Sequence, residues 1–320
     1  MPPVVDQPIR LLPIFRERVW GRESLAPYFS EIPWTGSARK ELIGEVWFTF
    51  TENQTSLGIP LGQLIEQQPT VLGKAADPKH PGVCPLLVKL LFTTERLSVQ
   101  VHPDDEYAEV HHRSLGKTEA WYVMEAEPSA EVAVGFRKKI TPERLRSAAV
   151  SGEIEQLLDW RKVKPGDVVY TPAGTVHAIG AGLTICEIQE NSDITYRLYD
   201  YGRPRELHLE HGTKVSDLGP HTADQQPVNL ASWRRQLAAS DYFRIEHLRP
   251  LKNLEIERGL PYYLLLVCLK GSGSIGGQRF ETGQCWMIPA GGAEVDIQST
   301  DAEWILTYTA DEATNALHGE

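Results

Sequence analysis

The sequence predicts a mainly β protein made of two jelly-roll β-barrels with short helical insertions. The 320 residues include 22 prolines and 26 glycines spread along the chain, which favours many short strands joined by turns over a helical bundle. Short apolar runs of the length of strands recur from residue 43 to residue 309. A weak internal repeat relates a segment ending at Pro172-Ala-Gly174 to one ending at Pro289-Ala-Gly291.

The repeat predicts an N-terminal domain of residues 1–230 and a C-terminal domain of residues 231–320. The first copy continues to His177, whereas the second continues through Gly292-Ala-Glu294 without a histidine. Residues 203–230 hold several Pro, Gly and Asp residues and little apolar periodicity, which is typical of a connection. We therefore expect a functional first barrel and a degenerate second barrel that binds no metal.

Helical insertions are predicted where capping signals occur. Thr141 followed by Pro142 is a typical helix start, and residues 151–160 suggest a second helix. The remaining expected elements, in chain order, are a strand at 43–50, a short helix at 60–75, a proline-rich loop at 77–85, a short helix at 104–112, and strands at 242–248, 262–270, 283–289 and 303–309.

Four side chains of the first half have the types and spacing of a metal site. Gln100 and His102 lie two residues apart on a predicted strand, so they point to the same face. Glu119 lies on the next predicted strand, and His177 follows a Pro/Gly turn. If these strands are neighbours, two imidazoles, a carboxylate and an amide oxygen converge. That set of ligands suits a borderline divalent cation such as Zn²⁺.

Composition excludes several classes of function. The net charge of −11 provides no basic field for nucleic acid or an anionic membrane, so an anionic substrate would need a local cluster of Lys and Arg. The apolar run 262–269 is too short to span a bilayer, and the N-terminus lacks the features of a secretory signal. The four cysteines form no CxxC pair. We expect a cytoplasmic protein with free thiols.

Five ordered motifs resemble the cupin superfamily and, more narrowly, the type I mannose-6-phosphate isomerases in their short bacterial form. The motifs are Leu87-Val-Lys89-Leu-Leu, Ser98-Val-Gln100-Val-His102-Pro-Asp, Gly116-Lys117-Thr-Glu119-Ala-Trp-Tyr, Pro172-Ala-Gly-Thr-Val-His177-Ala, and Glu187-Ile-Gln-Glu-Asn-Ser-Asp193-Ile-Thr-Tyr-Arg197-Leu-Tyr-Asp200. The chain departs from the family at Arg22, where a second glycine is common, and at Gly116, where some longer members carry a histidine.

The resemblance implies interconversion of mannose 6-phosphate and fructose 6-phosphate through an enediol. It also implies one zinc ion per chain, bound by Gln100, His102, Glu119 and His177, and a catalytic role for Arg197. No nucleic acid or membrane partner is expected, and the oligomeric state stays open.

The residues that move the proton and bind the phosphate are less well defined by sequence. Asp193, four residues before Arg197, is the first candidate base, and Glu187 is the second. Lys89 and Lys117 supply positive charge for the oxyanion or for the phosphate, with Lys117 as the leading phosphate ligand and Lys89 and Arg22 behind it.

Alternative interpretations remain at this stage. One is an iron- or manganese-using bicupin dioxygenase, which the two lysines and Arg197 argue against. Another is a catalytically silent sugar-binding or regulatory homologue. Arg197 could also be a structural ion-pair partner of Asp193 or Asp200.

Overall fold

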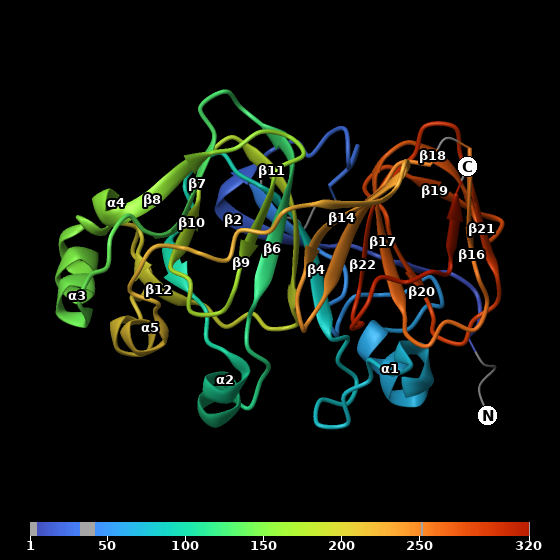
Figure 1. Ribbon diagram of the computed structural model, residues 1–320, viewed down its shortest axis with the longest axis horizontal. Helices are drawn as coiled ribbons and strands as arrows, with labels where there is room; N and C mark the ends of the chain where they lie inside the picture. The colour runs from blue at the N-terminus through green and yellow to red at the C-terminus, as the bar shows by residue number, and fades with distance from the viewer. Residues whose placement is uncertain (1–4, 33–41, 251, 320) are drawn as a thin grey trace.

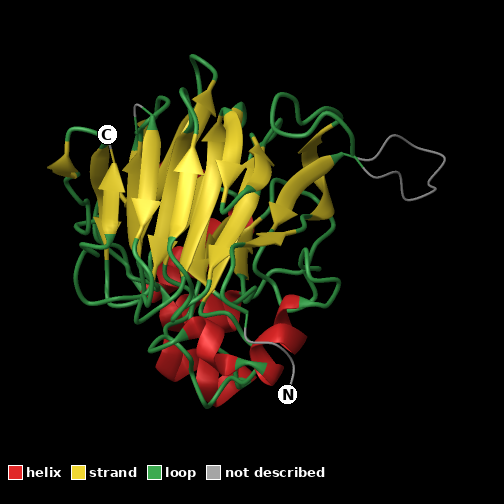
Figure 2. Cartoon of the chain, turned by 90° about the vertical axis from the view of Figure 1, so that its right-hand side faces the viewer, coloured by secondary structure: helices red, strands yellow, loops and turns green. Residues whose placement is uncertain are grey.

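The computed structural model describes residues 5–32, 42–250 and 252–319, and it is mainly β, as predicted (Figure 1). The strands form four antiparallel sheets, which we number by their position across the molecule. Helices gather at one end of the strands (Figure 2). None of the helices in the described residues has the length and hydropathy that a bilayer crossing requires.

Sheets 1 and 2 make up the half of the molecule that carries the resembling motifs. Sheet 1 has the order β12 (Tyr196–Tyr199), β5 (Val99–Val101), β10 (His177–Ile179), β7 (Glu131–Phe136) and β8 (Leu158–Lys162). Sheet 2 has the order β2 (Ile14–Arg22), β3 (Ile43–Trp47), β4 (Leu86–Phe92), β11 (Leu183–Glu190), β6 (Glu119–Ala126) and β9 (Val168–Thr171).

Sheets 3 and 4 make up the other half. Sheet 3 has the order β1 (Ile9–Leu11), β20 (Cys285–Ile288), β17 (Leu264–Lys270), β22 (Glu303–Tyr308), β15 (Arg244–Leu248), β14 (Arg234–Ala239) and β13 (Val228–Ala231). Sheet 4 has the order β19 (Gln278–Glu281), β18 (Ser272–Ile275), β21 (Val295–Gln298), β16 (Asn253–Ile256) and β23 (Leu317–Gly319).

Buried clusters place the four sheets in layers. Between sheets 1 and 2, Val134 and Ile179 pack in one cluster with Trp121 and Ile185. Between sheets 2 and 3, Val88 and Ile188 share a cluster with Leu265 and Met287. Between sheets 3 and 4, Leu266 and Trp286 share a cluster with Leu254 and Ile297. Strand β4 is buried at all seven positions. Sheet 2 is therefore covered on both faces, with sheet 1 on one side and sheet 3 on the other.

The helices are short and pack at the edges of this stack. They are α1 (Leu61–Gln67), the 3₁₀ turn η1 (Pro69–Leu72), α2 (Asp105–His112), α3 (Pro142–Ser151), α4 (Ile154–Leu157) and α5 (Leu209–Val215). The Asp104 side chain caps α2 by accepting from Tyr107 N, and Thr141 caps α3 by accepting from Arg144 N. The helix starts predicted at residues 104 and 141 are confirmed, whereas the helix predicted from residue 151 begins at Ile154.

Three predicted elements differ in the structure. Residues 158–160, predicted as the end of a helix, belong to β8, because pairing with β7 outweighs local helix preference. The predicted connection 203–230 contains α5 and the start of β13. The strand predicted to carry Gln100 and His102 is short, because β5 ends at Val101, and the apolar residues around Lys89 form a separate strand, β4, in another sheet.

The two halves are joined by more than a linker. Strand β1, near the start of the chain, pairs with β20 in sheet 3, so the N-terminal segment crosses to the C-terminal half. The two pairs of facing sheets fit the predicted internal duplication. Closure of each pair into a jelly-roll barrel and a boundary at residue 230 stay predictions.

Candidate metal centre and active-site cleft

Sheet 1 presents a row of polar side chains toward sheet 2. Arg197 on β12 pairs with Gln100 on β5, and Gln100 pairs with His177 on β10. Directly opposite residues in antiparallel strands lie about 4.5–5.5 Å apart, so these three side chains are neighbours. His102 follows Gln100 by two residues and shares its face.

Sheet 2 presents a second polar row on the facing side. Lys89 on β4 pairs with Glu187 on β11, which pairs with Trp121 on β6. Glu119 lies two residues before Trp121 and points the same way. The predicted convergence of the two histidines and Glu119 therefore comes from two facing sheets.

His102, Glu119 and His177 form a buried cluster with the geometry of a metal site. One ligand atom from each lies within 4.8 Å of the others. His177 Nε2 is 3.2 Å from Glu119 Oε1, and His102 Nε2 is 3.5 Å from Glu119 Oε2. All three side chains are at most 1% exposed. Among the described residues, no other group of three His, Cys, Asp or Glu side chains meets this geometry.

Backbone carbonyl groups fix both imidazoles in the form that binds a cation. His102 Nδ1 donates to Ile194 O at 2.8 Å, and His177 Nδ1 donates to Thr175 O at 2.9 Å. Both Nε2 lone pairs then face Glu119. Burial lowers the pKa of His177 to about 4, and burial with the Lys117 charge lowers the pKa of His102 well below its usual range.

The donor set fits a divalent cation. Both imidazoles are neutral at pH 7, as ligation requires. Glu119 Oε2 is buried and accepts no hydrogen bond from any described residue. The nearest cation is the Lys117 ammonium group at 3.2 Å, which does not meet hydrogen-bond geometry, and a divalent metal would compensate this buried carboxylate better than the lysine alone.

Gln100 lies at the edge of this cluster. Its Nε2 is 3.2 Å from His177 Nε2, and its Oε1 accepts from the Ser98 hydroxyl at 3.3 Å. A half-turn of the amide exchanges its oxygen and nitrogen and aims Oε1 at the His177 side. Gln100 is thus placed to be a fourth ligand.

Lys117 lies against the metal cluster. Its Nζ is 3.1 Å from His102 Nε2 and 3.2 Å from Glu119 Oε2, and the residue is 5% exposed. Burial opposes its charge, but Glu119 and Glu187 outweigh that effect and raise the pKa of Lys117. The ammonium group is therefore a fixed positive charge beside the ligands.

Lys89 and Glu187 form a buried ion pair on the sheet 2 wall. Lys89 Nζ is 3.1 Å from Glu187 Oε1 and 2.6 Å from Gln189 Oε1. It also lies 4.7 Å from the centre of the Trp47 ring, a cation–π distance. Burial raises the pKa of Glu187, although Lys89 opposes the shift.

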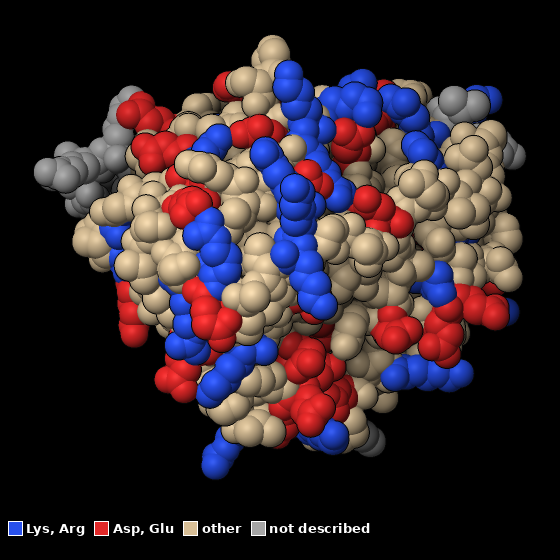
Figure 3. Space-filling view, turned by 60° about the vertical axis from the view of Figure 1, so that its left-hand side comes forward, with Lys and Arg blue, Asp and Glu red and all other residues tan. Residues whose placement is uncertain are grey.

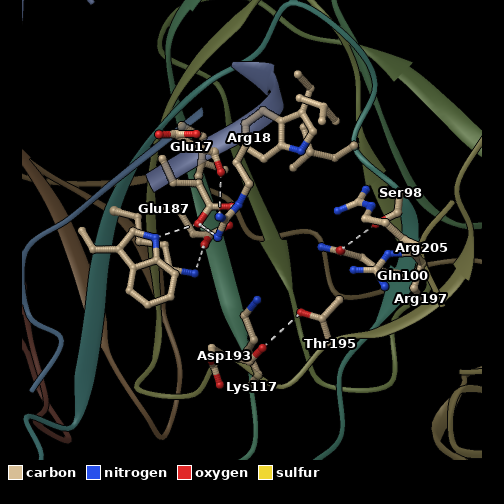
Figure 4. A pocket seen from close by; sticks show the side chains of 17 residues that line it. Glu17, Arg18, Ser98, Gln100, Lys117, Glu187, Asp193, Thr195, Arg197 and Arg205 are labelled. Atoms are coloured by element: carbon tan, nitrogen blue, oxygen red, sulfur yellow. Dashed lines mark hydrogen bonds and ion pairs between the residues drawn. The ribbon is translucent and has the colours of Figure 1, made fainter. Parts of the chain in front are cut away.

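A cleft of about 510 Å³ opens beside the cluster. In Figure 4, Arg197, Arg205, Ser98 and Gln100 lie on one wall, Arg18, Glu17 and Glu187 lie on the other, and Lys117 and Asp193 lie together between them. The cleft therefore brings together Lys89, Gln100, Lys117, Glu187, Asp193 and Arg197, six of the residues that the sequence singled out.

The Arg197 side chain is not used in an ion pair with Asp193 or Asp200 within the described residues. Its Nη1 donates to Glu206 O at 2.9 Å, while its buried Nε has no partner there. Asp200 is held instead by Arg205, at 2.6 and 2.7 Å, and by Arg203. Burial and the neighbouring Arg205 lower the pKa of Arg197, but a guanidinium stays charged.

Sequence reasoning missed four charged residues of the cleft, Glu17, Arg18, Glu45 and Arg205. Arg18 makes a bidentate contact with Glu45 at 2.8 and 3.0 Å, and Trp47 Nε1 also donates to Glu45. Burial alone would raise the pKa of Glu45, but Lys89 and Arg18 lower it. Alternation along β3 was visible in the sequence, and it places Glu45 and Trp47 on one face.

Arg22 lies outside the cleft, packed on the opposite end of β11. It donates to Thr184 Oγ1 at 3.1 Å and to Leu183 O at 3.0 Å.

Positive charge is concentrated locally on the surface despite the net charge of −11. On the face seen in Figure 3, Lys and Arg side chains form a band with acidic residues on both sides.

The fold and the site together define a protein of stacked antiparallel sheets with a candidate metal site, whose side chains come from two facing sheets. A family profile described as phosphomannose isomerase type I, catalytic domain, matches residues 9–137. Mannose-6-phosphate isomerase ManA of Bacillus subtilis is 34% identical over 328 residues, covering 95% of this chain and 100% of the relative.

Solved structures of mannose 6-phosphate isomerases have the same fold as this chain. A crystal structure of mannose 6-phosphate isomerase from Bacillus subtilis superposes with a TM-score of 0.84 at 29% identity, over 94% of this chain and 99% of that one. A zinc-bound mannose 6-phosphate isomerase shares the fold, with a TM-score of 0.74 at 17% identity, over 95% of this chain and 99% of that one. The chain belongs to the type I mannose-6-phosphate isomerase family.

Proposed function

We propose that the protein interconverts mannose 6-phosphate and fructose 6-phosphate through an enediol, with one zinc ion per chain. The observation that carries this proposal is a buried cluster of two neutral imidazoles and a carboxylate beside a cleft lined by cations. Gln100, His102, Glu119 and His177 are the proposed ligands. The bound ion would polarise the oxygens on C1 and C2 without changing its redox state.

The chain's own cations would stabilise the negative charge that forms on the sugar oxygens. Lys117 is fixed beside His102 and Glu119, so we assign it to the sugar rather than to the phosphate. Arg197 lies next to Gln100 on the same row of sheet 1, within reach of the same oxygens. Both charges are preorganised by burial or by backbone contacts, which is the condition for strong oxyanion stabilisation.

Asp193 is the first candidate for moving the proton between C1 and C2. It is exposed to the cleft, and Figure 4 shows it beside Lys117. Glu187 is the second candidate, but its contact with Lys89 at 3.1 Å occupies one oxygen. We assign to Lys89 and Glu187 the shaping and charge balance of the sheet 2 wall.

The phosphate group would bind at the Arg205 side of the cleft. Asp200 holds Arg205 through Nε and Nη2, which leaves Nη1 for an anion. Ser98 lies on the same wall, and its hydroxyl, which donates to Gln100 Oε1, would become free to donate to the phosphate once the Gln100 amide is turned for ligation. A positioned guanidinium suits phosphate because it offers parallel N–H donors.

Two further assignments accompany this function. All four cysteines are free and buried, which suits a reducing compartment such as the cytoplasm. We also propose that residues 231–320 form a second domain without a metal site. A dioxygenase with an apolar substrate is disfavoured, because the cleft contains Arg18, Lys89, Lys117, Arg197 and Arg205.

The test is a coupled assay of fructose 6-phosphate formation. Zinc-loaded protein should convert mannose 6-phosphate, chelator should abolish the activity, and added zinc should restore it. His102→Ala should lose metal and activity, whereas the control His80→Ala, which changes a histidine paired with Asp77 away from the cleft, should keep both. A zinc-loaded protein with no turnover would overturn the proposal.

A further inference from the structure

Three consecutive backbone N–H groups around Lys117 all donate hydrogen bonds, two of them to residues 103–105 and one to Glu190. Gly116 N donates to Asp105 Oδ1 at 2.7 Å, Lys117 N donates to Pro103 O at 2.9 Å, and Thr118 N donates to Glu190 Oε2 at 2.7 Å. Short bonds from backbone N–H groups to carboxylates are among the stronger hydrogen bonds of proteins. The segment 116–118 is thus fixed at every residue.

The approach of this segment to α2 depends on Gly116. A Cβ at that position would lie 2.5 Å from Asp105 N and 2.6 Å from the Asp104 carbonyl carbon, closer than real Cβ atoms come. Because both contacts are backbone, they cannot move aside cheaply. Gly116 lets Asp105 reach the segment, and a larger residue would push Lys117 out of place.

We propose that Asp105 and Glu190 are positioning residues, whose carboxyl groups clamp residues 116–118 and so hold the Lys117 ammonium beside His102 and Glu119. The inference rests on the isomerase function proposed above. Neither carboxyl group touches the cleft, so each acts on the substrate only through Lys117. Asp105 comes from α2 and Glu190 from the end of β11, so the clamp ties sheet 2 to that helix.

The two carboxyl groups form an unusual pair. Neither makes an ion pair with a Lys, Arg or His among the described residues, and Glu190 is 4% exposed. The other titratable groups that interact with Glu190 are Tyr170 and Tyr242, neither of them a cation. Burial, together with Asp105, raises the pKa of Glu190 to about 8. At neutral pH, one proton therefore prevents repulsion between the two groups.

A loss of that proton should loosen the clamp. A carboxyl group with a raised folded-state pKa contributes stability below its unfolded pKa, and this contribution is lost as the pH rises through about 8. Glu190→Gln imitates the protonated side chain, and its amide oxygen still accepts from Thr118 N. We expect Glu190→Gln to resist alkaline pH better than the native protein does.

The first experiment is a double-mutant cycle on zinc-loaded enzyme. Glu190→Ala should lower kcat by about 10- to 100-fold, since small misplacements of catalytic groups have effects of this size. In the Lys117→Ala background, Glu190→Ala should lower kcat no further. Glu190→Gln should stay near native, and so should the control Asp77→Ala, which removes a carboxylate that accepts from Lys79 N away from the site. An equal loss in both backgrounds would refute positioning through Lys117.

The second experiment measures how the clamp affects thermal stability, without an activity assay. Melting temperatures of metal-free native protein and Glu190→Gln, measured from pH 6 to pH 9.5, should diverge between pH 6 and about pH 8, where the native protein loses the stability contributed by the Glu190 proton, and their difference should be constant at higher pH. Parallel curves would overturn the shared proton. This measurement stands even if mannose 6-phosphate is not converted, so failure of the clamp and failure of the proposed function are distinguishable.

Discussion

Replacing Arg197 by alanine should separate catalysis from folding. Among the described residues, its side chain makes one hydrogen bond, from Nη1 to Glu206 O at 2.9 Å. One such bond contributes about 0.5–1.5 kcal/mol to stability. Loss of a preorganised oxyanion donor typically lowers kcat by about 10²–10³, equivalent to about 2.7–4 kcal/mol of transition-state stabilisation. We therefore expect a catalytic loss well beyond any loss of stability.

The assay compares kcat, KM, bound zinc and melting temperature for the native protein, Arg197→Ala and Arg197→Lys. The alanine variant should keep zinc and fold, and lose kcat by the factor above. Lysine should recover part of the rate, because it keeps the charge without the planar fork of donors. Near-native kcat in Arg197→Ala would refute the catalytic role. Loss of zinc in parallel with kcat would show that the residue supports the metal site instead.

Three other predictions concern metal content, phosphate and thiols. Native protein should bind one equivalent of zinc per chain by elemental analysis, and His177→Ala should bind none; a second equivalent in the native protein would contradict a single metal site. Arg205→Ala should raise KM for mannose 6-phosphate more than for mannose, and equal effects on both would argue against a phosphate role. Burial raises the pKa of Cys84 and of Cys268 to about 12, so the native protein should react with thiol reagents at pH 8 only after denaturation; rapid labelling of native protein would contradict this.

The metal cluster was predictable from sequence because its signals are local. Two-residue spacing puts Gln100 and His102 on one face whatever the topology, and the order of the motifs suggested neighbouring strands. The sequence could not show that His102 and Glu119 belong to different sheets. That arrangement depends on how sheets 1 and 2 face each other.

The missed cleft residues depend on long-range pairing. Arg18 reaches the cleft because β2 folds back onto β3, which positions it against Glu45. Arg205 is placed by its contact with Asp200 in a segment with no apolar periodicity. The same limit explains residues 158–160, whose Leu-Asp-Trp sequence is compatible with either helix or strand until β7 is available as a partner.

The layered arrangement explains how sheet 2 tolerates so many charges. The side chains of sheet 2 that face away from the cleft, such as Val88, Leu90 and Ile188, pack into the buried cluster shared with sheet 3. A separated N-terminal fragment would leave that face wet and would leave β1 without β20. Water entering from behind would screen the buried pair of Lys89 and Glu187 and loosen its geometry. Sheets 3 and 4 carry none of the proposed metal ligands, but they keep water away from the back of the sheet that forms one wall of the cleft. We therefore expect the N-terminal half to be active only together with the C-terminal half.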